Sequence, residues 1–362
     1  MKIISNMFSV IFVLSCLAVF MAGGGCRSVN RSPGLTPVDG RNAVLTGWGI
    51  GLDQFAIAKE AGTRQIFSFS KDPKELALLV QKGKEFNMPV YGCVTPVLDK
   101  SFPQQEMNAE ECAFRDKVHA DKTREKGGYQ FGGEPYLPLE VLDQSIACFH
   151  HEAVRDEVKK NIRDVVMVDG IAGVAFDSFG YCNYRCCRCD HSMELARAYR
   201  AKHPELTEAQ TLNTFSLESL VDFNNEMADY ARSVKAGIRI ANHVHPVFLP
   251  DIYYGNRLKL DECCQTAAWF FKPYWSKERM EEHVRIIFGD EKKYWPSAEG
   301  AALVGLGATE KSSYEPKPAE RFEFELKTLL NAGADRIQIC SFSDVLKSPA
   351  HVAVLKKIFA GK

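Results

Sequence analysis

Short apolar runs alternate with longer amphipathic stretches along most of the chain. Val44–Gly49, Arg64–Ser70 and Pro89–Val97 are rich in β-branched and aromatic residues, a composition typical of strands. In Pro73–Phe86 and Glu152–Val168 the apolar residues instead recur at helical spacing, and a proline opens the first of these helices. The pattern therefore predicts strands and helices in regular alternation.

The same alternation continues to the C-terminus. The other predicted strands are Val174–Phe176, Ile238–Val244, Thr266–Phe271, Lys293–Ser297 and Asp335–Cys340. The other predicted helices are Glu205–Lys235, Ser276–Phe288, Pro318–Asn331 and Pro349–Phe359. Eight strands separated by helices favour parallel pairing through right-handed crossovers.

About 320 residues in this pattern fit a single (β/α)8 TIM barrel over residues 41–362. We interpret the polar stretch from Leu98 to about Leu139 as an insertion after the third strand. The alternative is a doubly wound open sheet, but no early strand is followed by the glycine-rich phosphate-binding turn of that fold.

Composition excludes two classes of protein. The 362 residues include 45 basic and 46 acidic side chains, a formal net charge of -1, and 46% hydrophobic residues. A near-neutral chain lacks the basic surplus that a nucleic-acid binder needs. The apolar content and low net charge also argue against intrinsic disorder.

The N-terminus has the order of a secretory signal peptide. Lys2 is followed by an uncharged apolar run and then by small residues, so residues 1–25 are expected to be removed. Cys26 follows three glycines and resembles the lipidated cysteine of bacterial lipoproteins. We therefore expect export, lipid anchoring of Cys26 to a membrane in the periplasm or at the cell surface, and a tether over residues 26–40. The alternative is a retained membrane anchor, since no charge lies between Lys2 and Arg27.

Candidate chemistry follows from the ends of the predicted strands, because TIM barrels carry their reactive groups there. Asp177 follows the fourth predicted strand and Glu299 the seventh, so we expect two carboxylates across the barrel mouth. Such a pair can cleave a glycosidic bond, with one group attacking or steering water and the other protonating the leaving oxygen. The alternative roles are a helix cap for Asp177 and a solvated loop position for Glu299. The expected substrate contacts are Trp48, Tyr181, His243, His245 and Lys272.

Two segments resemble barrel glycoside hydrolases of the α-amylase and β-galactosidase type. Cys148–Val158 (CFHHEAVRDEV) is similar to a helix start in those enzymes, and Asp169–Asp177 (DGIAGVAFD) to the strand that follows it. Ala153 stands where the family usually has proline. The resemblance implies a TIM barrel in which Asp177 is the nucleophile or a close substrate contact.

Four of the twelve cysteines lie within a short run after the fourth predicted strand. Several of the barrel glycosidases that this chain resembles hold a structural zinc on such cysteines. The resemblance thus implies a possible zinc on Cys182, Cys186, Cys187 and Cys189, and four thiolates can form a closed tetrahedral site. Disulfides are the alternative, because export leads to an oxidising compartment. The partners of Cys182 and Cys186 would then be drawn from Cys112, Cys148, Cys263 and Cys264.

Three hypotheses remain open at this point. The first is an exported, lipid-anchored glycoside hydrolase that acts on an oligo- or polysaccharide and requires no cofactor. The second is a glycan-binding lipoprotein that keeps the barrel without catalysis. The third is a metal-dependent barrel hydrolase that uses His243 and His245, whose spacing of two places them on one face of a strand.

Overall fold

The computed structural model describes residues 35–120, 145–244, 251, 253–270, 272, 274–290, 299–306 and 317–361. These belong to one compact unit, Leu35–Lys362. The expected signal peptide, Cys26 and His245 lie outside the described residues, so export and lipidation stay predictions. No helix in the described part of the chain is long and apolar enough to span a membrane.

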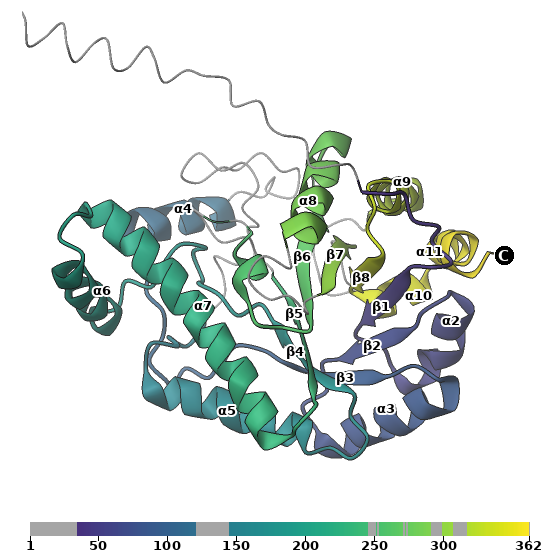
Figure 1. Cartoon of the computed structure of the whole chain (residues 1–362), viewed down its shortest axis with the longest axis horizontal. Coiled ribbons are helices and arrows are strands. Elements are labelled where there is room, and N and C mark those ends of the chain that lie inside the picture. The colour runs from purple at the N-terminus through teal and green to yellow at the C-terminus, as the bar shows by residue number, and fades with distance from the viewer. Residues whose placement is uncertain are drawn as a thin grey trace, which may run out of the picture. The chain divides into compact units, whose positions relative to one another are not determined.

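Eight parallel strands close into a barrel in chain order, each paired with its sequence neighbours and β8 paired with β1 (Figure 1). The strands are β1 Val44–Trp48, β2 Gln65–Ser68, β3 Val90–Val94, β4 Gly173–Asp177, β5 Arg239–His243, β6 Glu262–Ala268, β7 Glu299–Gly305 and β8 Arg336–Cys340. This topology confirms the predicted TIM barrel.

Helices surround the strands, as Figure 1 shows for α2, α3 and α5. The helices are α2 Phe55–Glu60, α3 Pro73–Phe86, α4 Ala109–Ala120, α5 Glu152–Val166, α6 Asp190–Lys202, α7 Glu208–Val234, α8 Lys277–Asp290, α9 Ala319–Asn331, α10 Phe342–Lys347 and α11 Pro349–Leu355. The start of α3 matches the prediction because Asp72 accepts a hydrogen bond from the Lys74 amide and Pro73 occupies the first turn. Helix α4 lies in the segment after β3, where residues 121–144 are outside the described part, so the insertion stays a prediction.

The barrel interior holds an aromatic cluster that is separate from the larger core between strands and helices. Trp48, Phe67, Tyr91 and Cys93 are its largest members. Tyr91 and Cys93 are two residues apart on β3 and therefore point to the same side of the sheet. Full burial of each aromatic side chain stabilises the fold by about 1.5–3 kcal/mol.

A chain of hydrogen bonds crosses the interior beneath this cluster. The Trp48 indole N–H donates to Gln338 Oε1 at 2.6 Å, and the Gln338 amide donates to the Glu262 carboxylate. Glu262 is fully buried, and burial raises its pKa. These bonds satisfy polar groups that would otherwise be costly to bury.

The seventh strand of the barrel is β7 Glu299–Gly305, which pairs with β6 from Glu299 opposite Glu262 onward. The segment predicted as this strand, Lys293–Ser297, lies outside the described residues. The sequence of β7, EGAALVG, contains small residues and only one β-branched side chain, so its strand signal is weak. The small residues are needed for packing, because a Cβ on Gly305 would lie 2.1 Å from the Phe270 ring.

His283 on α8 generates a prediction about stability. It is 4% exposed, its Nδ1 donates to the Thr266 carbonyl at 3.2 Å, and its ring packs on Trp275. Burial, followed by the charge of Arg279, lowers the pKa of His283 to about 3. A histidine in the unfolded chain has a pKa of about 6.5. At a pH between about 6.5 and about 3, His283 is therefore protonated in the unfolded state and neutral in the folded state.

We therefore expect this residue to reduce the free energy of unfolding as pH falls below about 6.5, by about 2 kcal/mol at pH 5. His283→Gln should flatten the dependence between pH 7 and pH 5, measured by urea denaturation at each pH. His203→Gln, at a half-exposed histidine, is the matched control. An unchanged slope in His283→Gln would contradict the assignment.

Candidate functional site

The candidate site lies at the C-terminal ends of β4 and β5. Asp177 ends β4 and His243 ends β5, and the parallel register places the two residues opposite each other. His243 Nδ1 donates to Asp177 Oδ1 at 2.9 Å. The His243 side chain is 2% exposed and that of Asp177 is 17% exposed, so the carboxylate is the member that a ligand can reach.

The backbone at the mouth is strained at two serines. Ser178, directly after Asp177, has a φ of 58°, and Ser341, directly after β8, has a φ of 62°. Non-glycine residues seldom adopt this left-handed conformation, and such strain clusters at functional sites. The Ser178 hydroxyl donates to Asp177 Oδ1 at 3.2 Å. Asp177 Oδ1 is therefore held by two donors.

Thiols and aromatic rings surround the Asp177–His243 pair. Burial and the charge of Asp177 raise the pKa of Cys93 on β3, and they raise that of Cys340 on β8 to about 12. Both thiols are thus protonated at neutral pH. The His243 ring lies 5.4 Å from the Trp48 ring in an edge-on arrangement. The site combines a reachable carboxylate with neutral walls.

Glu299 does not join this site, and the prediction that it does was wrong. It opens β7, whereas Asp177 closes β4, so in a parallel barrel the two lie at opposite ends. Its carboxylate forms ion pairs with Arg239 Nη2 at 2.9 Å and Arg336 Nη2 at 2.7 Å. These arginines open β5 and β8, so Glu299 belongs to a charged ring at the N-terminal end of the barrel.

Of the other expected substrate contacts among the described residues, Trp48 and Tyr181 are buried and Lys272 is exposed. Trp48 is fully buried beneath the mouth, and Tyr181 is 2% exposed with its hydroxyl donating to the Ser216 carbonyl at 3.0 Å. Phe69, which the sequence analysis did not single out, is 39% exposed and lies 5.7 Å from the Trp48 ring. Its position directly after β2 is the feature of the sequence that could have identified it as a candidate contact.

The cysteines form a cluster that differs from the predicted run. The ten cysteines among the described residues are all free thiols. Cys148 Sγ lies 3.8 Å from Cys189 Sγ, and both sulfurs lie within 4.8 Å of a ring nitrogen of His151. The Ser192 hydroxyl contacts the two sulfurs at 3.3 and 3.1 Å. Cys148 and His151 come from the loop before α5, so the cluster joins two loops of the barrel.

The donor set of this cluster fits a zinc ion. Two sulfurs that bind one zinc ion tetrahedrally, each at about 2.3 Å, lie about 3.8 Å apart, which is the separation of the Cys148 and Cys189 sulfurs. Two thiolates and one imidazole are also donors that zinc prefers. Cys187 is next to the cluster, because the Cys189 amide donates to its sulfur at 3.5 Å and a hydrogen bond from Cys148 lowers its pKa to about 5. Cys182, Cys186 and Cys187 lie outside the group of Cys148, His151 and Cys189.

No family model matches the sequence, and no curated protein resembles it at significant similarity. Solved structures do share the fold. The PgaB (BpsB) glycoside hydrolase domain of Bordetella bronchiseptica aligns with 88% of this chain and 99% of its own at 12% identity, with a TM-score of 0.54.

Two β-galactosidases are similar to the chain in the same way. That of Halorubrum lacusprofundi aligns with 86% of this chain at 13% identity and a TM-score of 0.56, and that of Rahnella sp. R3 with 91% at 11% identity and 0.53. The alignments cover 57% and 58% of those two enzymes, so this chain spans little more than half their length. At these identities the likeness is one of fold.

Proposed function

Starting from a fold that solved glycoside hydrolases share, we propose that this chain is a glycoside hydrolase with Asp177 as its reactive carboxylate. The observation that carries the proposal is the Asp177–His243 pair at the C-terminal ends of β4 and β5. TIM-barrel enzymes place their reactive groups at this end. The fold of the solved relatives and the resemblance around Asp177 add support.

In this proposal His243 and Ser178 orient the carboxylate. Both donate to Oδ1 of Asp177, which leaves Oδ2 to face a bound glycan. A carboxylate fixed in this way either attacks the anomeric carbon or stabilises the positive charge that develops on the sugar ring in the transition state. In both cases the bond to the leaving oxygen breaks, and that oxygen takes its proton from water. Phe69 offers an exposed apolar ring beside the site for the C–H face of a sugar.

A second candidate is a glycan-binding protein without catalysis. The observation that favours it is the position of Glu299, since the carboxylate expected to complete a pair with Asp177 lies at the other end of the barrel. In this alternative Asp177 would accept hydrogen bonds from sugar hydroxyls. Only the first candidate, the glycoside hydrolase, predicts turnover of a glycoside.

Asp177→Asn should lower kcat for hydrolysis about 10²- to 10⁴-fold while glycan binding is retained, because the amide keeps the shape but cannot attack or carry the charge. Release of 4-nitrophenol from a panel of 4-nitrophenyl glycosides measures turnover. Glu299→Gln is the matched control and should leave kcat unchanged, since its ion pairs lie at the opposite end of the barrel. Full activity in Asp177→Asn would overturn the role of Asp177. Glycan binding without turnover in the wild type would establish the second candidate.

We also propose that Cys148, His151 and Cys189 hold a structural Zn²⁺ with Cys187 as the fourth ligand. A closed four-ligand zinc supplies a cross-link rather than catalysis. Here it would tie the loop before α5 to the loop that follows Asp177 and β4. The hydroxyl of Ser192, which contacts two of the sulfurs, would orient them.

Purified wild-type protein should contain about one zinc per chain after dialysis, as measured by mass spectrometry of the metal content. Cys189→Ser and His151→Ala should lose most of it. Cys186→Ser should retain it, because Cys186 is not one of the four proposed ligands. Zinc retained in Cys189→Ser and lost in Cys186→Ser would contradict this ligand set. A Cys148–Cys189 disulfide in the purified chain would exclude the metal.

A further inference from the structure

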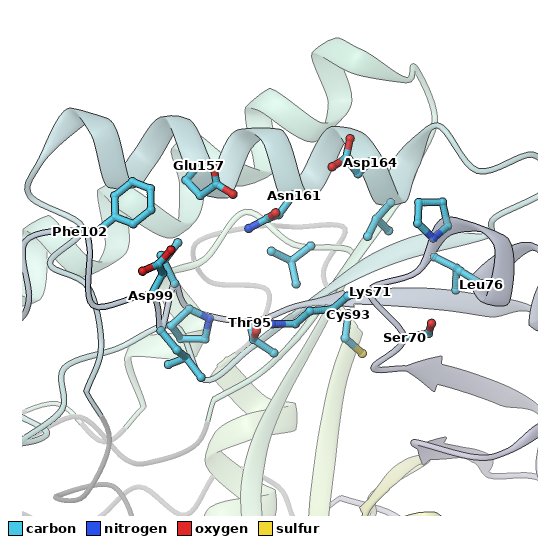
Figure 2. A pocket seen from close by; sticks show the side chains of 16 residues that line it. Ser70, Lys71, Leu76, Cys93, Thr95, Asp99, Phe102, Glu157, Asn161 and Asp164 are labelled. Carbon is cyan, nitrogen blue, oxygen red and sulfur yellow. The ribbon is translucent and has the colours of Figure 1, made fainter.

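A cavity of about 280 Å³ lies beside β3 and is not part of the Asp177–His243 pair (Figure 2). Its walls come from the start of α3, from α5 and from the segment that follows β3. Ser70 and Thr95, which line it, follow the C-terminal ends of β2 and β3. The cavity therefore lies at the same end of the barrel as the candidate site.

Gly92 on β3 explains why the apolar side of this cavity is closed. A Cβ at Gly92 would lie 2.5 Å from Val165 Cγ1 and 2.9 Å from Leu76 Cδ2. The missing side chain lets α5 and α3 pack closely over the strand, so Val165 and Leu76 both lie against Gly92 and line the cavity. The cavity is therefore shaped by the core, before any ligand binds.

Polar groups line the rest of the cavity. Glu157, Asn161 and Asp164 occur at spacings of four and three along α5 and therefore share one face of that helix, which Figure 2 shows above Thr95 and Lys71. The hydroxyl of Thr95, the amide of Asn161 and the two carboxylates on α5 offer both hydrogen-bond donors and acceptors to a ligand that carries several hydroxyl groups.

Charge and size restrict the ligand. The lining includes the carboxylates of Asp99, Glu157 and Asp164 and one ammonium, that of Lys71. Lys160 neutralises Glu157 through an ion pair at 3.0 Å, so the remaining lining charges sum to −1 and disfavour an anion. The volume lies just below the range of about 300–1,000 Å³ that is typical of drug-sized ligands. Phe102 adds an aromatic ring to the wall, a surface on which the C–H face of a pyranose can pack.

We propose that this cavity is a second carbohydrate site, which binds one hexose-sized sugar unit without negative charge. The choice of a sugar rests in part on the proposed function, whereas the cavity and its charge do not. The site acts by binding alone, with Asn161 and Asp164 contacting sugar hydroxyls and Phe102 packing against the ring. It is distinct from the place where Asp177 acts.

The test is ligand-observed NMR titration of the full chain with galactose, glucose, glucosamine and glucuronate. The wild type should bind at least one of the first three and bind glucuronate at least tenfold more weakly. Asn161→Leu and Asp164→Asn should each weaken sugar binding at least tenfold. Asp156→Asn, an exposed carboxylate on α5 outside the cavity, is the matched control and should leave binding unchanged.

The titration in Asn161→Leu separates this proposal from the proposed function, because Asp177→Asn is expected to retain glycan binding whether or not the cavity binds sugar. Sugar binding that falls in Asn161→Leu and Asp164→Asn and persists in Asp156→Asn supports the second site. Unchanged binding in Asn161→Leu, no binding of any of the first three sugars, or tightest binding of glucuronate overturns it. Turnover of 4-nitrophenyl glycosides is scored independently, so either proposal can fail while the other stands.

Discussion

Each strand of this barrel is hydrogen-bonded to a parallel neighbour on both sides, and that constraint decides which side chains can meet. All strands end on the same side, so residues at the ends of adjacent strands become neighbours whatever their separation in sequence. Asp177 and His243 are 66 residues apart and yet share a hydrogen bond. The same constraint separates Asp177 from Glu299 by the length of the barrel, because one ends its strand and the other begins it.

The loop after Asp177 is attached to the segment after β3 at two places. Gln105 accepts from the Cys182 amide at 2.8 Å and donates to the Gly180 carbonyl at 3.0 Å. Further along, Cys189 meets Cys148 from the other segment. The loop that follows the carboxylate at the mouth is thus held to this segment by contacts at both places. The cavity beside β3 uses the same segment as one of its walls, so both proposed sites depend on how the chain between β3 and α5 packs.

Local signals predicted the fold well and the site only in part. Helix α3 has a proline, a cap and an apolar face within its own sequence, so its bounds were predictable. Strand β7 was missed because alanine and glycine are four of its seven residues, and their role is to leave room for neighbours such as Phe270. Asp177 was identified from its position after a strand. Its pairing with His243 and the contact between Cys148 and Cys189 depend on register and loop packing, which periodicity along one chain does not encode.

The positive φ angles of Ser178 and Ser341 affect how tightly a ligand can bind. Holding a non-glycine residue in this conformation costs about 1–3 kcal/mol, and the folded barrel meets that cost before any ligand arrives. A ligand that reaches Asp177 then finds the loop already ordered, and it avoids the loss of about 0.5–1.5 kcal/mol for each side chain that would otherwise be immobilised on binding. The strain at the mouth of the barrel thus lowers the folding stability, and it reduces the conformational entropy that is lost when a ligand binds there.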